Sequence, residues 1–499
     1  MDLSFEKNAC AYLRRVIRQT QVQEQTQEVR LPDSMPDIGR VLASWGQCVL
    51  RSKQWQSDGM SISGGIMTWT LYLPEDGGEP ACLEAWLPFQ MNWSFPETRR
   101  EGRIRADCLL RSVDARSLSA RRLLVRGSVA VDAEALESEQ AEIPVPKDVP
   151  PDVELLRQSY PMLLPREAGE KTFTLEETPD WPGGCPAPRR VLLYPAVPEL
   201  AEEKIVGQRL AFRGTLRLHL LCSGEDGRLY PCDLAVPFSQ FAELDGDYGP
   251  EAAAALTLGV TGLEVHWSEE DGLHLKCGMV AQYTVSDRVM VELVEDLYSP
   301  VRPAEPTMEM LSLPAILDSR TETVHGTQSF SGAAGTAADV TVWPDVPQLL
   351  GSGDTQSVEL PGTVQVLYYD PEGTLQAESG RFLLHQPYPS DVNVTVNPTA
   401  VLIGTPAAGS ANGELTAEFD LTVTMSARTD RGLPTVVSAA LGEAGEPDPA
   451  RPSLILRRAE EERLWDLAKR CGSTVRAITE ANKLTGEPEA DRMLLIPVS

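Results

Sequence analysis

The sequence predicts a mainly β protein with three tandem β-rich domains of sandwich or barrel type, one amphipathic N-terminal helix and a small C-terminal βααβ domain. Short runs alternate between apolar and other residues, as in MTWTLYL at 67–73 and TLRLHL at 215–220. Clusters of Gly, Pro, Asp and Glu separate these runs, which is the pattern of strands joined by turns. One hairpin-like segment also recurs at a nearly constant interval.

This internal repeat spans about 26 residues in each copy. The three copies read GGIMTWTLYLPEDGGEPACLEAWLPF, RGTLRLHLLCSGEDGRLYPCDLAVPF and PGTVQVLYYDPEGTLQAESGRFLLHQPY. Gly65, Gly214 and Gly362 are 149 and 148 residues apart, and Phe89 and Phe238 are 149 apart. A period of this length corresponds to a whole domain rather than to a short solenoid unit.

The predicted boundaries follow from the composition of the segments between the repeats. Residues 1–26 carry apolar positions near helical spacing and predict the amphipathic helix. Segments rich in Pro, Gly or acidic residues predict linkers, because they have little apolar surface to bury. The resulting division is: helix 1–26, repeat one 27–142, linker 143–170, repeat two 171–300, repeat three 301–441, linker 442–453 and a C-terminal module 454–499.

Composition and charge exclude several classes of protein. The 499 residues carry 44 Lys and Arg against 73 Asp and Glu, a formal charge of −29, which disfavours nucleic acid and anionic lipid as partners. The nine cysteines are scattered without a CxxC pair, as suits a reducing cytosol. No apolar run has the length of a signal peptide or a membrane span, so neither export nor membrane insertion is expected.

The C-terminal module differs in pattern from the repeats that precede it. Its sequence runs LILRR, ERLWDLAKRCG, TVRAITEANK and MLLIPV, which predicts strand, helix, helix, strand. The segments LWDLAKR at 464–470, AITEAN at 477–482 and LLIP at 494–497 look like LysM. The resemblance implies binding of N-acetylglucosamine glycans such as peptidoglycan between two loops. The binding residues would be Glu461, Glu462, Arg463, Leu464, Trp465, Asn482, Lys483, Leu484 and Thr485.

This copy departs from the LysM pattern where the backbone would approach a sugar. Glu461, Glu462 and Arg463 replace the usual Gly-Asp-Thr, and Ala490 and Asp491 replace the usual Pro-Gly. Long charged side chains obstruct a close approach and favour contact with a protein. Two alternatives remain open for Trp465 and Asn482: a role in binding, or a purely structural role.

The first repeat contains LPDSMPDIGRVL at 31–42, the hairpin beginning at Gly64 and Gly65, and LPF at 87–89. These segments look like the SPOCS domain of spore-coat proteins. With the terminal LysM-like module, the layout is similar to that of the SipL-like family of spore-coat morphogenetic proteins. It implies an adaptor in the mother-cell cytoplasm, at the forespore surface, that contacts a coat-basement ATPase scaffold and other coat proteins.

Catalytic and cofactor motifs are missing from the sequence. The five histidines lack the spacing of a zinc site, and no P-loop, Rossmann fingerprint or nucleophile elbow is found. We therefore expect no metal, no cofactor and no enzymatic activity. The main hypothesis is a non-catalytic coat scaffold. The alternatives are a peptidoglycan-binding protein that anchors the coat to the cortex and a cell-wall hydrolase.

Overall fold

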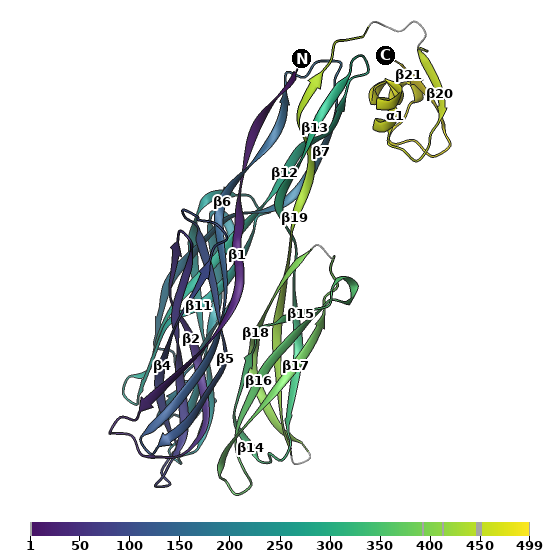
Figure 1. The fold of residues 1–499 in the computed structure, drawn as a ribbon. Coiled ribbons are helices and arrows are strands. Elements are labelled where there is room, and N and C mark those ends of the chain that lie inside the picture. Colours follow the sequence, from purple (N-terminus) through teal and green to yellow (C-terminus); the bar gives the residue numbers. More distant parts are fainter. Residues whose placement is uncertain (1, 392–393, 412–413, 446–451, 499) are drawn as a thin grey trace.

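The computed structural model describes residues 2–391, 394–411, 414–445 and 452–498. It confirms the mainly β class, since almost all of the chain before the C-terminal module is in strands (Figure 1). Three successive sets of strands have the same pairing pattern, and we call them the first, second and third units.

In the described part of the chain, six strands form each of the first two units, and seven form the third. The first unit holds β1 (Asp2–Arg30), β2 (Ile38–Gln56), β3 (Gly59–Pro74), β4 (Ala81–Ser94), β5 (Arg103–Ser119) and β6 (Arg122–Lys147). The second holds β7 (Glu154–Glu177), β8 (Arg190–Leu193), β9 (Ala196–Ser223), β10 (Leu229–Tyr248), β11 (Ala253–Ser268) and β12 (Gly272–Tyr298). The third holds β13 (Ala304–Phe330), β14 (Thr336–Pro344), β15 (Gln348–Leu350), β16 (Ser357–Tyr369), β17 (Leu375–Pro387), β18 (Thr395–Ala411) and β19 (Glu414–Leu441).

Two antiparallel sheets build each unit. One sheet contains the central hairpin: β2–β3–β4 in the first unit, β8–β9–β10 in the second, and β14–β16–β17 in the third. In the other sheet the last strand lies between the first strand and the penultimate one, as in β1–β6–β5, β7–β12–β11 and β13–β19–β18. Apolar side chains from both sheets of the first unit form one buried core, and the third unit has a similar core.

The repeated hairpins share a glycine that faces a phenylalanine across the strands. Backbone pairing places Gly64 opposite Phe89, Gly214 opposite Phe238 and Gly362 opposite Phe382. A Cβ on any of these glycines would lie 2.2–2.7 Å from the phenylalanine ring. The structural equivalent in the first unit is therefore Gly64, one residue before the Gly65 chosen from the sequence.

The first and second units are packed into one continuous core. Trp45, Trp69 and Leu71 of the first unit are buried together with apolar residues of β9, β10 and β12. The opposite face of the same β2–β3 pair covers the core of the first unit. This explains why β3 is buried along almost its whole length rather than on alternate residues.

Long strand pairs continue beyond the sheets and assemble into a stalk. We use this name for residues 2–15 and 136–147, 154–164 and 287–298, and 304–316 and 428–441, which belong to three antiparallel strand pairs. Apolar side chains from all three pairs meet inside it. At its end, Asp2 and Leu3 pair with Ala440 and Ala439, so the first strand joins the last strand of the third unit. Figure 1 shows the stalk rising above the packed sheets.

The predicted N-terminal helix is wrong. Residues 2–30 form β1, which pairs with β6 along almost its full length. Tyr12 and Leu13 are both buried but belong to different apolar clusters, because the strand is covered on both faces at this point. Consecutive buried residues, followed by an irregularity between Arg15 and Ile17, break the alternation and imitate helical spacing.

The predicted linker 143–170 is also wrong for most of its length. Its residues belong to the end of β6 and to most of β7, with only 148–153 between them. Prolines such as Pro144 and Pro161 suggested a linker. Each strand here has a partner along one edge only, and proline is tolerated in such edge strands. In the second predicted linker, Gly442 and Gly445 donate hydrogen bonds to Pro303 and Val301, while 446–451 lie outside the described residues.

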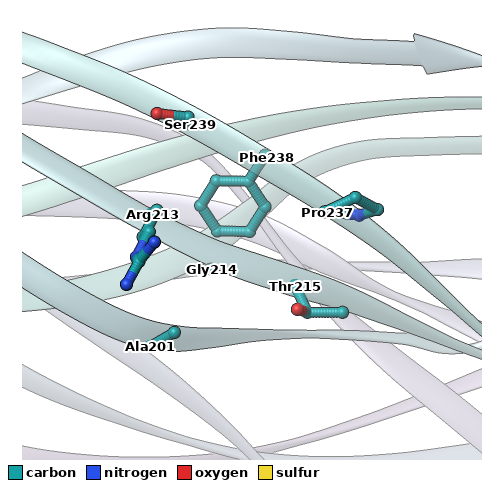
Figure 2. Close-up of a pocket in the computed structure, with 7 residues that line it drawn as sticks. All are labelled: Ala201, Arg213, Gly214, Thr215, Pro237, Phe238 and Ser239. Carbon is teal, nitrogen blue, oxygen red and sulfur yellow. The ribbon is translucent and has the colours of Figure 1, made fainter.

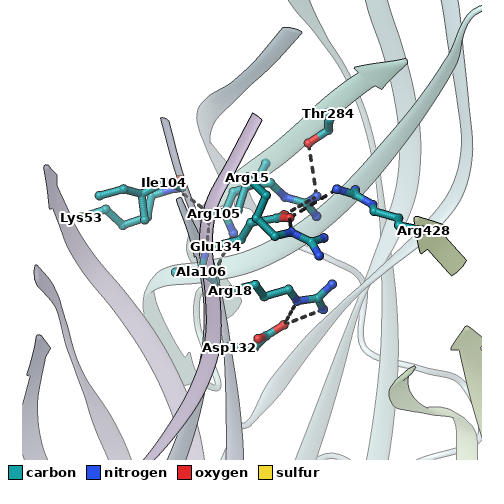
Figure 3. Close-up of polar contacts among 11 residues, drawn as sticks. Arg15, Arg18, Lys53, Ile104, Arg105, Ala106, Asp132, Glu134, Thr284 and Arg428 are labelled. Carbon is teal, nitrogen blue, oxygen red and sulfur yellow. Dashed lines mark hydrogen bonds and ion pairs between the residues drawn. The ribbon is translucent and has the colours of Figure 1, made fainter. Parts of the chain in front are cut away.

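A charged cluster lies where strands of all three units approach one another (Figure 3). Glu134 of β6 is 5% exposed and forms ion pairs with Arg15 of β1 at 2.6 Å, Arg428 of β19 at 3.4 Å and Arg105 of β5 at 3.7 Å. Arg105 also donates a hydrogen bond to Thr284 of β12. Burial opposes ionisation of Glu134, but the arginines outweigh it and lower its pKa to about 2.

A histidine joins the second unit to the third. His219 Nδ1 lies 2.7 Å from Asp233 Oδ1, and its Nε2 lies 2.9 Å from Oδ1 of the buried Asp339 in β14. Trp45 of the first unit reaches the same place by donating a 2.8 Å hydrogen bond to Thr341. Burial opposes protonation, yet the two carboxylates raise the pKa of His219 to about 10.

We predict that Gly362→Ala destabilises the protein by about 1–3 kcal/mol, because the new methyl group overlaps both the Phe382 ring and the Trp343 carbonyl oxygen. The shift of the urea unfolding midpoint measures this. Gly183→Ala is the matched control, since nothing lies within 4 Å of the added Cβ. Equal midpoints for the two variants would contradict the role assigned to the glycine.

We predict that the stabilisation by His219 falls as the pH rises from about 6.5 to 10. The imidazolium is favoured in the folded state, so its contribution is complete below the unfolded pKa and is lost as the pH passes the folded pKa. The free energies of unfolding of the native chain and His219→Gln, measured by urea titration, should therefore converge over this range, with a gap on the order of 2–4 kcal/mol at pH 6. A gap independent of pH would exclude a charged bridge.

Candidate partner-binding site in the C-terminal module

The C-terminal module contains two short strands and two short helices. They are β20 (Leu454–Arg458), α1 (Leu464–Cys471), α2 (Val475–Asn482) and β21 (Met493–Pro497), with β20 antiparallel to β21. Gly472 ends α1 in the left-handed conformation, at φ 62°. The Thr474 hydroxyl begins α2 by accepting a 3.0 Å hydrogen bond from the Ala477 amide.

The two loops that the sequence singled out lie side by side at the start of α1. The Leu464 amide donates a 2.8 Å hydrogen bond to the Glu487 carboxylate, which links the loop before α1 to the loop after α2. The predicted residues divide by exposure: Glu461, Arg463, Lys483 and Thr485 are exposed, Glu462 and Asn482 are half-buried, and Leu464, Trp465 and Leu484 are buried. Only part of the predicted set is therefore accessible.

Charged side chains of the first loop are paired within the module. Glu462 accepts from Arg470 at 2.7 Å, and Arg463 forms an ion pair with Asp466 at 3.0 Å. These contacts keep both side chains along the surface of α1. The Arg463–Asp466 pair is exposed and contributes little to stability, so a partner can displace it at low cost.

Asn482 has a structural role. Its Nδ2 donates to the carbonyl oxygens of Ile478 and Leu495 at 2.8 and 2.6 Å, and its Oδ1 accepts from the Leu495 amide at 2.7 Å. The side chain thus joins the end of α2 to β21. Both the amide nitrogen and the amide oxygen of this side chain are therefore used in hydrogen bonds to the backbone of the module.

Trp465 is buried against the stalk. Its ring meets the Tyr298 ring edge-on at a centroid distance of 4.8 Å, and its Nε1 donates a 2.8 Å hydrogen bond to Asp296. Lys469 donates to both oxygens of the same carboxylate at 2.8 and 2.7 Å. The Tyr298 hydroxyl donates to the Ser473 carbonyl at 3.0 Å. These contacts dock α1 on the end of the stalk, as Figure 1 shows for the module as a whole.

The outer face of the two strands is an exposed apolar surface. Leu454, Leu456, Met493 and Leu495 are 52%, 63%, 49% and 39% exposed. Leu456 pairs directly with Leu495, so these side chains form a contiguous patch. The alternate residues Leu494 and Ile496 are buried beneath the helices. We call the four exposed side chains the apolar face of the module.

The second unit has an open depression of about 450 Å³ over its hairpin. Figure 2 shows the Phe238 ring at Gly214, with Arg213 on one side and Pro237 and Thr215 on the other. Arg213 is the one charged residue of the lining and forms an ion pair with Glu202 at 2.5 Å. The depression results from the glycine–phenylalanine packing of the hairpin, and no carboxylate, histidine or cysteine lies in its lining beside the hydroxyls of Thr215 and Ser239.

The sequence did not identify Asp296, Tyr298 or the apolar face. Asp296 and Tyr298 lie about 170 residues before the helix that they contact, and only the tertiary arrangement brings them together. A signal for the apolar face was present in LIL and MLLI, because such runs place apolar side chains on both sides of a two-stranded sheet. Among the described residues, no group of His, Cys, Asp and Glu has the arrangement of a metal site.

No protein-family model, curated protein or solved structure matches this chain. Neither helix in the described part of the chain has the length and apolarity of a membrane-spanning segment.

We predict that Asp296→Ala loosens the docking of the module. The indole of Trp465 and the ammonium of Lys469 would lose their shared acceptor, at a cost of about 1–3 kcal/mol. Faster amide hydrogen exchange in α1 would report this, with exchange in the central strands unchanged. Glu480→Ala, which removes an exposed ion pair with Arg476, is the control and should leave α1 unaffected. Unchanged exchange in α1 of Asp296→Ala would show that the carboxylate does not hold the module.

Proposed function

We propose that the chain is a non-catalytic scaffold or adaptor in assembly of the bacterial endospore coat. It would act in the mother-cell cytoplasm, at the forespore surface, through protein–protein contacts. The proposal is supported by the residues that resemble SPOCS repeats and a terminal LysM. Its partners would be the coat-basement ATPase scaffold and other coat proteins.

The observation that carries the proposal is the apolar face of the docked module. Contiguous exposed apolar side chains on a soluble surface are typical of protein contact sites. Leu454, Leu456, Met493 and Leu495 lie on the strands, whereas Trp465 on α1 makes the contact with the stalk. The module can therefore present this face to a partner while α1 remains docked.

Peptidoglycan binding has less support as the function of the module. A glycan site would draw on the loops around Trp465 and Asn482. The indole nitrogen of Trp465 is bonded to Asp296, and the amide of Asn482 is bonded to the backbone of Leu495. Neither group is left to recognise a sugar hydroxyl in the docked arrangement.

We predict that Leu456→Glu combined with Leu495→Glu lowers capture of a coat-basement ATPase from sporulating-cell lysate by about 30-fold or more. Once a partner covers them, Leu456 and Leu495 are expected to contribute at least about 2 kcal/mol to the free energy of binding. The experiment uses the full chain as bait. Met290→Glu is the matched control, because Met290 is 57% exposed on β12 of the stalk.

Other outcomes of the same experiment would replace the proposal. Retention of the full chain by insoluble peptidoglycan, competed away by soluble chitin fragments, would support a cortex anchor. Release of soluble muropeptides during that incubation would indicate a cell-wall hydrolase. Equal capture of the ATPase by the double variant and Met290→Glu would exclude the apolar face as the contact site.

A further inference from the structure

The charged cluster between the units contains more positive than negative side chains. Arg15 and Arg18 come from β1, Arg105 from β5, and Arg428 from β19 of the third unit. Two carboxylates of β6 face them: Glu134, and Asp132, which pairs with Arg18 at 2.7 Å. Figure 3 shows the four guanidinium groups gathered around these two acids.

Two other charged groups nearby do not balance the excess. Lys53 lies beside the cluster and forms its own ion pair with Glu170 at 2.5 Å. Asp107 is the third acid near Arg105 and Arg18, and burial raises its pKa. Even with Asp107 counted as ionised, four arginines face three carboxylates, so the cluster carries net positive charge.

Some of the guanidinium nitrogens lack acceptors. Within the described ranges, Arg15 Nη2 and Arg105 Nε are buried and have no hydrogen-bond partner. Buried donors without acceptors destabilise the folded state, because they lose their hydrogen bonds to water without replacement. The charged form of Arg428 is also disfavoured, and its pKa is lowered to about 10. Burial is the largest cause, and the positive charges of Arg15, Arg105 and Arg18 add to it.

The arginines are nevertheless within reach of a small solute. The side chains of Arg15, Arg18, Arg105 and Arg428 are 23%, 19%, 13% and 19% exposed. Guanidinium groups bind tetrahedral oxyanions through paired N–H donors, and several groups that converge from different strands can share one such ion. An added anion would supply acceptors and reduce the repulsion among the four cations.

We infer that this cluster is a binding site for a small inorganic oxyanion, phosphate or sulfate, held between the first and third units. The ion binds beside Glu134, with Arg428 contributed by β19 and the other arginines by β1 and β5. The formal charge of −29 on the whole chain opposes its approach, so binding is weak and falls with ionic strength. Occupancy strengthens the junction between the two units.

The test is thermal unfolding of the full chain in 0–20 mM sodium phosphate, with sodium chloride added to keep the ionic strength constant. We expect a rise of about 2–4 °C that is steepest at the lowest phosphate concentrations and then grows only with the logarithm of the concentration, and a similar rise with sulfate. General stabilisation by these salts grows in proportion to concentration and is small in the millimolar range. A rise no larger than that of chloride would overturn the proposal.

Binding is also measured directly by the broadening of the phosphate ³¹P NMR signal. Arg428→Gln should abolish the broadening, and Arg18→Gln provides a second variant if the first does not fold, as judged by circular dichroism. Arg476→Gln on α2 is the control and should retain it, since Arg476 is 86% exposed and remote from the cluster. Broadening that persists in folded Arg428→Gln or Arg18→Gln would overturn the site. Capture of coat proteins does not bear on this result, so the two proposals fail independently.

Discussion

Continuous antiparallel pairing of the three long strand pairs is the constraint on which the rest of the structure depends. β1 with β6, β7 with β12, and β13 with β19 each run from the packed sheets into the stalk. Their inner ends carry the sheets, and their outer ends enclose the apolar interior of the stalk. The Glu134 cluster and the docking site for α1 both lie on these strands, so their geometry follows from the pairing.

The fold class was predictable because it depends on local signals. Alternating apolar residues and turn clusters specify strands wherever one face is solvated, and the mainly β prediction is confirmed. The prediction of an N-terminal helix was wrong because this local signal is missing there. Tyr12 and Leu13 are covered on opposite faces by other parts of the chain, so the sequence there contains no alternation. The prediction of a linker at 143–170 was wrong because strands that pair along only one edge tolerate proline, so proline content alone does not distinguish them from a linker.

The candidate site was predictable only in part. The sequence pointed to the loops before α1 and after α2, and a hydrogen bond from the Leu464 amide to Glu487, just beyond the predicted residues of the second loop, links them. It could not show that Trp465 is covered, because Asp296 and Tyr298 come from a distant strand. The same limit applies to the arginines around Glu134, which belong to strands more than 400 residues apart at the extremes, Arg15 and Arg428.

The pairing of Asp2 and Leu3 with Ala440 and Ala439 has a consequence for synthesis on the ribosome. Leu3 is synthesised more than 400 residues before its partner Ala439. Until then the edge of β1 at the stalk end is an open template for pairing with another chain. An unpaired edge of this kind on a partly synthesised chain favours binding of a chaperone to β1.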